Sequence, residues 1–253
     1  MIFTRALLIV ILSASPIQAA GGWVKLFNGK NLEGWTPKIR GYALGENYGD
    51  TFRASGGILS VHYDKYDKFE DRFGHLFYKT PYSKYRFRFE YRFKGESCPG
   101  APGWAWRNSG VMVHGQDPAT MDIHQAFPVC IEVQLLGGGP SGERSTANLC
   151  SPGTHVVMGG KLETQHCVNS SSATFRGDSW VKFEVEVLGS GVIRHFVEGK
   201  QVMEYQEPQL DPGDGDAEKL IRDGVLLLDR GTISLQAEGH PVEFRKIEIK
   251  EIP

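Results

Sequence analysis

The chain has 253 residues, of which 40% are hydrophobic and 23% are charged, a composition typical of a globular protein that buries a core. Its 28 basic and 30 acidic residues give a net charge of −2, so it lacks the basic excess that nucleic-acid binding requires. The 31 glycines and 13 prolines divide the chain into many short elements, which favours an all-β protein.

The first twenty residues have the pattern of a secretory signal peptide. Arg5 precedes an apolar run over residues 6–12, and small residues follow as far as Ala19 and Ala20. This run is far shorter than the roughly 20 residues that span a bilayer, and no later segment is long enough, so no transmembrane segment is expected. We therefore predict a signal peptide at residues 1–20, a single domain at residues 21–253, and a secreted or periplasmic protein.

Alternation of apolar and polar residues predicts strands along most of the remaining chain. In residues 86–93, aromatic side chains share one face and charged side chains the other. Segments 189–191 and 198–200 each contain glycine and are typical of hairpin turns. The other clear predicted strands cover residues 58–62, 110–114, 129–135, 181–188, 193–197, 232–236 and 242–249.

The predicted strands and the segments between them indicate a β-sandwich with long loops. Insertions are expected at residues 96–107, 137–173 and 208–224, the last with a short helix near residues 217–222. Long loops on a rigid sandwich are where binding residues usually lie.

The four cysteines all lie in the part of the chain that is predicted to be exported, where disulfides form. Three pairings are conceivable. Cys150 and Cys167 flank one Gly- and Ser-rich segment, so we favour this pair, which leaves Cys98 with Cys130. No two cysteines have the close spacing that structural zinc favours, and disulfides are therefore preferred to a metal site.

Strand alternation singles out three polar residues as candidate site residues. Glu132 and Gln134 point to the face opposite the apolar residues of their strand, and His114 is expected on the same side of a neighbouring strand. A carboxylate beside an imidazole is a plausible acid–base pair, although outward-facing polar residues are also what a solvated sheet face shows. No second carboxylate follows Glu132 along its strand, which argues against a retaining glycosidase, where two carboxylates act together.

Other candidates lie in loops. Trp104 and Trp106 could stack on sugar rings or cap the core. His155, His166 and His240 lie in or beside loops, from which they could reach a site. No dinucleotide-binding, P-loop or zinc-protease motif is present in the sequence.

Residues 25–35, KLFNGKNLEGW, resemble the opening motif of the bacterial 3-keto-disaccharide hydrolase domain family. Four further segments resemble motifs of this family in the same order, so the resemblance covers nearly the whole mature chain. These segments are NSGVMV at 108–113, IEVQLL at 131–136, GTISLQ at 231–236 and VEFRKIEIK at 242–250.

The resemblance implies a concanavalin A-like jelly-roll β-sandwich that cleaves 3-keto-glycosides. In such substrates one base can take the proton at C2, the group at C1 leaves by elimination, and water then adds, so no nucleophilic carboxylate is needed. The base would be Glu132 or His114, and Gln134 would orient the substrate. Weaker candidates for contacts with the substrate are Arg53, Lys79, His155, Gln236, His240, Trp104 and Trp106.

The sequence departs from the family pattern at two of these residues. His240 stands two positions beyond the histidine of the family segment LQxHG, and His114 stands where many members have arginine. No cofactor is predicted. A divalent cation could supply the electrophile, but the sequence shows no convincing ligand set.

Two other expectations accompany the enzyme hypothesis. A sugar 3-oxidoreductase is expected upstream, because it would make the 3-keto substrate. The alternative function is a non-catalytic, lectin-like carbohydrate-binding module, since the same sandwich fold hosts both classes.

Overall fold

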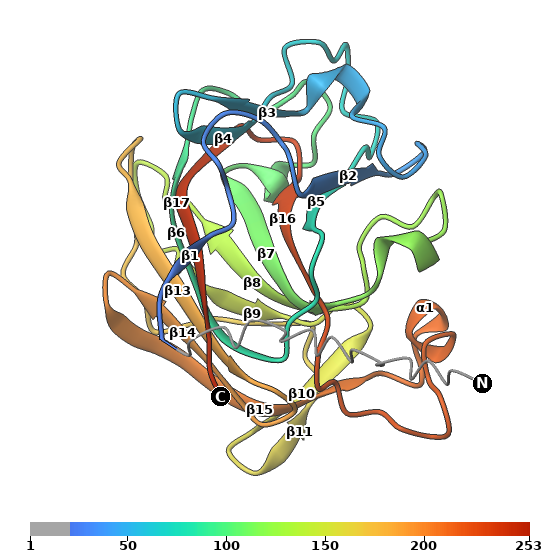
Figure 1. Ribbon diagram of the computed structural model, residues 1–253. Helices are drawn as coiled ribbons and strands as arrows, with labels where there is room; N and C mark the ends of the chain where they lie inside the picture. The colour runs from blue at the N-terminus through green and yellow to red at the C-terminus, as the bar shows by residue number, and fades with distance from the viewer. Residues whose placement is uncertain (1–20) are drawn as a thin grey trace, which may run out of the picture.

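The computed structural model describes residues 21–253, and the predicted signal peptide lies outside the described residues. Two antiparallel sheets pack face to face, as Figure 1 shows, and enclose the main core. The 10-stranded sheet has the order β11-β10-β15-β14-β13-β6-β17-β4-β3, with β1 pairing β17. The 7-stranded sheet has the order β12-β9-β8-β7-β16-β5-β2. The predicted all-β jelly-roll sandwich is thereby confirmed.

The elements have the following bounds. The 10-stranded sheet contains β1 (Val24–Lys25), β3 (Phe52–Ser55), β4 (Ile58–Val61), β6 (Lys84–Phe93), β10 (Thr154–Met158), β11 (Lys161–Glu163), β13 (Val181–Leu188), β14 (Val192–Val197), β15 (Lys200–Leu210) and β17 (Val242–Glu251). The 7-stranded sheet contains β2 (Trp35–Ile39), β5 (Gly74–Tyr78), β7 (Asn108–Gly115), β8 (Ile131–Leu136), β9 (Asn148–Cys150), β12 (Cys167–Val168) and β16 (Thr232–Ala237). The helices are α1 (Gly215–Glu218) and the 3₁₀ turns η1 (Tyr48–Asp50), η2 (Gly103–Ala105) and η3 (Pro118–Thr120).

Strand β6 shows why this sequence forms a sandwich. Its aromatic residues alternate into the core, while its charged residues lie on the outer face of the 10-stranded sheet. There Arg88 pairs with Glu248, and Arg92 pairs with Glu243, both from β17. Cross-strand ion pairs of this kind stabilise the outer face of the sheet. The two hairpins predicted from glycine, β13–β14 and β14–β15, are also present.

The insertions differ in detail from the prediction. Segment 137–173, expected to be a loop, contains the short strands β9 to β12. Helix α1 begins earlier than predicted, because Asp214 accepts hydrogen bonds from the first backbone N–H groups and fixes the start there.

The cysteine prediction was right for one pair and wrong for the other. Cys150 and Cys167 lie directly opposite each other in the β9–β12 pair and form a disulfide. Cys98 and Cys130 are both buried but not bonded to each other. Within residues 21–253, no helix is long and apolar enough to cross a membrane.

Candidate active site

The face of the 7-stranded sheet that is turned away from the core carries the candidate site. Val111, Ile131 and Leu235 point into the core from β7, β8 and β16. The alternate residues therefore point outward, and Glu132 and Gln236 are among them. These outward residues are nonetheless buried, because loops cover this part of the sheet.

A cavity of about 310 Å³ lies over this face, a volume typical of small-ligand sites. Strands β7, β8, β9 and β12 and the loops beside them supply its walls, and no lysine or arginine lines it. The lining residues are Trp104, Asn108, Phe127, Glu132, Gln134, Cys150, Pro152, His166, Cys167 and Glu238.

Glu132 lies in the cavity as a carboxyl group without partners. Its side chain is 6% exposed, and no group within residues 21–253 donates a hydrogen bond or pairs its charge. Burial therefore disfavours the ionised form and raises the pKa of Glu132 to about 8. The group thus holds a proton much more tightly than an exposed glutamate does, and is a stronger base once it has lost it.

Glu238 is a second carboxyl group in the same cavity, which corrects the expectation that no second carboxylate accompanies Glu132. It is 3% exposed, and its Oε2 atom has no hydrogen-bond partner. Burial, and then the negative charge of Glu132, raise its pKa well above the usual range. The sequence argument looked only along the strand of Glu132, whereas Glu238 follows β16, two strands away in the sheet. The alternation of Ser234, Gln236 and Glu238 was the signal that could have revealed it.

Gly110 leaves room for the polar groups above it. A methyl group at this position would lie 2.6 Å from Oε1 of Glu132 and 3.0 Å from Oε1 of Gln236. Both side chains therefore reach over the same glycine. Gln236 is fully buried, and neither atom of its amide has a hydrogen-bond partner. Gln236 is not among the residues that line the cavity, but it reaches over Gly110 as Glu132 does, so this unsatisfied buried amide is a candidate ligand contact.

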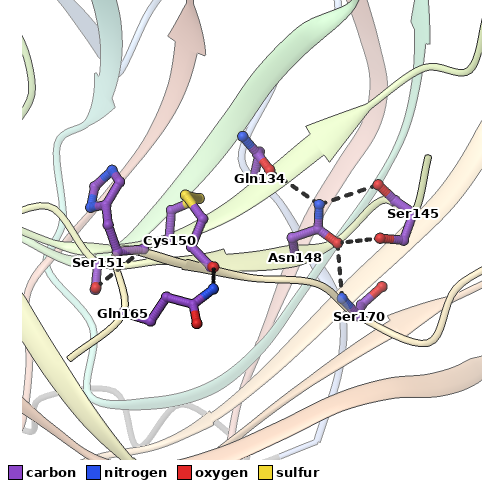
Figure 2. Close-up of a disulfide and its surroundings, with 9 residues drawn as sticks. Gln134, Ser145, Asn148, Cys150, Ser151, Gln165 and Ser170 are labelled. Atoms are coloured by element: carbon purple, nitrogen blue, oxygen red, sulfur yellow. Dashed lines mark hydrogen bonds between the residues drawn. A yellow bond between two sulfur atoms is a disulfide. The ribbon is translucent and has the colours of Figure 1, made fainter. Parts of the chain in front are cut away.

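Gln134 is held in one orientation by Asn148, as Figure 2 shows. The backbone N–H of Ser170 donates to Oδ1 of Asn148 at 2.9 Å, so the amide nitrogen of Asn148 must point the other way. That nitrogen donates to Oε1 of Gln134 at 3.1 Å and to the backbone oxygen of Ser145 at 3.2 Å. The arrangement leaves the NH₂ group of Gln134 as a free donor beside the cavity.

The disulfide and two aromatic residues complete the walls. The Cys150–Cys167 bridge ties β12 to β9 at the edge of the sheet. Trp104 is 54% exposed and stacks on Phe73, with ring centroids 5.8 Å apart. Phe127, Pro152 and His166 also line a second, neighbouring cavity of about 330 Å³.

His114 does not share the face of Glu132, so that expectation was wrong. Its φ of +49° and a register shift between β7 and β16 interrupt the alternation at this residue. Its Nε2 atom lies 3.0 Å from the backbone oxygen of Gly189, in the β13–β14 turn of the other sheet. Burial lowers the pKa of His114 to about 4, so the ring is neutral. His114 is therefore placed as a structural contact between the sheets, away from the cavity.

Three further candidates lie outside the cavity. Arg53 is in β3 of the other sheet and pairs with Asp64. Lys79 lines a different cavity. The Nε2 atom of His155 lies 3.3 Å from Oδ1 of Asp211. The family resemblance suggested these three residues, but it could not show which strands and loops meet at the cavity.

His240 and Trp106 pack against each other and do not line the cavity. Nδ1 of His240 lies 2.9 Å from Oγ of Ser97, and the ring is fully buried between Phe93 and Trp106. Burial lowers the pKa of His240 to about 4. Of the two tryptophans, only Trp104 lines the cavity.

Within residues 21–253, no group of three His, Cys, Asp or Glu side chains is arranged to hold a metal ion. A divalent cation as electrophile stays a prediction.

The sequence profile of the family described as the 3-keto-alpha-glucoside-1,2-lyase-like domain matches residues 22–250. The chain belongs to this family. Membership confirms the resemblance seen in the sequence motifs and supports a carbohydrate-active protein that acts on glycosides. No curated protein sequence matches the chain significantly.

Solved structures share the fold of this lyase-like domain. Two proteins of Parabacteroides distasonis, provisionally named as glycosyl hydrolases, are each 17% identical to the chain and cover 92% of it. Their TM-scores are 0.55 and 0.52, with 100% and 94% of their own chains covered. The Ca²⁺-bound exoplasmic/lumenal domain of VIP36 is 9% identical, with a TM-score of 0.50 and coverage of 87% of this chain and 84% of that chain. At these identities the likeness shows the sandwich alone.

Proposed function

We propose that this protein cleaves 3-keto-glycosides by elimination, with Glu132 as the base that takes the proton at C2. The observation that carries the proposal is the Glu132 carboxyl group, which lies in a cavity that no lysine or arginine lines and is only 6% exposed. Burial raises its pKa to about 8. A general base is most effective when its pKa lies near the working pH, and an exposed glutamate is a weaker base than this.

The chemistry of the substrate explains why one base can begin the reaction. A keto group at C3 acidifies the proton at C2, so its removal gives an enolate, and the bond from C1 to the glycosidic oxygen then breaks. Donors must stabilise the enolate oxygen as its charge develops. The NH₂ group of Gln134, oriented by Asn148, and the unpartnered amide of Gln236 are the candidates. Water then adds at C1 of the enone.

Ordinary retaining hydrolysis fits this cavity less well, although two carboxyl groups are present. A retaining enzyme needs an ionised nucleophile that later leaves from a glycosyl ester. Both carboxyl groups here have a raised pKa, and no lysine or arginine lines the cavity to hold either one ionised. A base must be ionised as well, but the raised pKa makes the ionised carboxylate of Glu132 a stronger proton acceptor, which suits proton abstraction.

The decisive experiment compares aglycone release from 4-nitrophenyl 3-keto-glucoside and from its unoxidised parent. We expect release from the keto substrate only, with a primary isotope effect when C2 carries deuterium, and loss of release in Glu132→Gln. The matched control is Glu33→Gln, which makes the same chemical change at an exposed residue without an ion pair. Equal release from both glucosides, or full activity of Glu132→Gln, would refute the proposal.

Trp104 supports a second candidate function, carbohydrate binding without catalysis. Its indole ring is 54% exposed at the cavity and could stack on a sugar ring. A binding module would release no aglycone and would bind sugar in calorimetry with Glu132→Gln unaffected and Trp104→Ala impaired.

Export and substrate supply belong to the same proposal. The Cys150–Cys167 disulfide supports export, because disulfides persist in oxidising compartments. An oxidoreductase that oxidises sugars at C3 must supply the substrate.

A further inference from the structure

The proposed elimination needs an acid as well as a base, because the glycosidic oxygen leaves as an anion unless it is protonated. Glu238 is the second carboxyl group of the cavity. Because Glu132 is the base, Glu238 is left without a role in the first step of the reaction. It enters from the end of β16, whereas Glu132 enters from β8. The two groups therefore approach a bound ligand from different strands.

The surroundings of Glu238 favour its protonated form. The carboxyl group is 3% exposed, and its Oε2 atom is buried without a hydrogen-bond partner. No cation lines the cavity, so two negative charges would face each other there without compensation. Once Glu132 ionises, its charge opposes ionisation of Glu238. The pair thus presents one base and one acid at the same time, as in other sites where environment separates two carboxyl groups.

We propose that Glu238 is the catalytic acid that donates its proton to the departing glycosidic oxygen; this rests on the proposed function. Glu132 takes the proton from C2, the electron pair of that bond forms the enolate, the C1–O bond breaks, and the oxygen takes the proton of Glu238. The Glu238 carboxylate then takes a proton from the water that adds at C1, and Glu132 returns its proton to C2. Both residues end as they began, and the net reaction consumes one water.

The test varies the leaving group. 4-Nitrophenol leaves easily without a proton, whereas methanol does not. Glu238→Gln should therefore lose kcat/KM by about 100-fold or more on methyl 3-keto-glucoside, the usual contribution of a general acid, and by less than about tenfold on 4-nitrophenyl 3-keto-glucoside. Glu132→Gln should lose both activities alike, because both substrates need the base.

Each outcome decides a separate point. Equal losses on the two substrates in Glu238→Gln, or no loss on either, would overturn the role of Glu238. If this variant does not fold, judged by its thermal unfolding, the wild-type protein supplies the test: kcat/KM should depend only weakly on leaving-group acidity, and a steep dependence would overturn the role. A wild-type protein inactive on both keto substrates would instead overturn the proposed function itself.

Discussion

Glu132→Gln should stabilise the fold at neutral pH while it abolishes the proposed activity. Between pH 4.5, the ordinary pKa of glutamate, and pH 8, the folded protein holds a proton on Glu132 that the unfolded chain has lost. The free energy of unfolding of the wild-type protein therefore falls as pH rises through this window. At about 1.4 kcal/mol per pH unit, the loss from pH 4.5 to pH 7 is about 3 kcal/mol.

Glutamine keeps the shape of the side chain but does not titrate. The difference in unfolding free energy between Glu132→Gln and wild type should therefore grow by about 3 kcal/mol over that pH range, or roughly 6–12 °C in Tm. Urea unfolding at several pH values measures it, with the exposed Glu33→Gln as the control that should follow wild type. A difference that does not change with pH would show that burial of Glu132 does not destabilise its ionised form, and the basis for its strong basicity would fail.

Four other perturbations test the site. The kcat/KM of the wild-type protein for a 3-keto-glucoside should rise as pH approaches about 8, because the ionised fraction of Glu132 rises, and a profile that is already flat at pH 6 would contradict this. Gly110→Ala should lower kcat by about 100-fold, because the added methyl group displaces the Glu132 carboxylate; normal kcat would show that this carboxylate can move freely. Trp104→Ala should raise KM roughly tenfold with an unchanged Tm, since the ring is half exposed, and an unchanged KM would remove Trp104 from the binding surface. Replacing Cys150 and Cys167 together by alanine should cost about 3 kcal/mol in urea unfolding, from the entropy of a 17-residue loop, and a loss near zero would contradict that account.

The strands could be predicted because each has a strict alternation with one face in a single core. Residues 181–188, for example, alternate buried side chains with exposed or partly buried ones over the whole predicted length. The same rule placed Glu132 and Gln134 on the site face. It failed at His114, because a positive φ at a register shift reverses the direction of a side chain without any change in the polarity pattern.

The neighbours of a strand could not be predicted from alternation. The order β8-β7-β16 brings Glu238 to the cavity of Glu132, although the two residues are more than a hundred positions apart in the chain. Similarly, Phe127 and Trp104 reach the cavity from loops whose paths depend on tertiary contacts. The family resemblance suggested candidates such as Arg53 and His155, which the fold places outside the cavity.

Buried polar groups without partners on the 7-stranded sheet support the candidate site independently of family membership. On the 10-stranded sheet the charged groups pair across strands, as Arg88 does with Glu248. On the 7-stranded sheet, Asn108, Gln236 and Glu238 all keep buried polar atoms without partners. Such atoms destabilise a fold, and a ligand bound in the cavity would satisfy them. Because a 3-keto sugar offers hydroxyl donors and carbonyl acceptors around one ring, it could satisfy these amide and carboxyl atoms, whereas an apolar ligand would leave them unsatisfied.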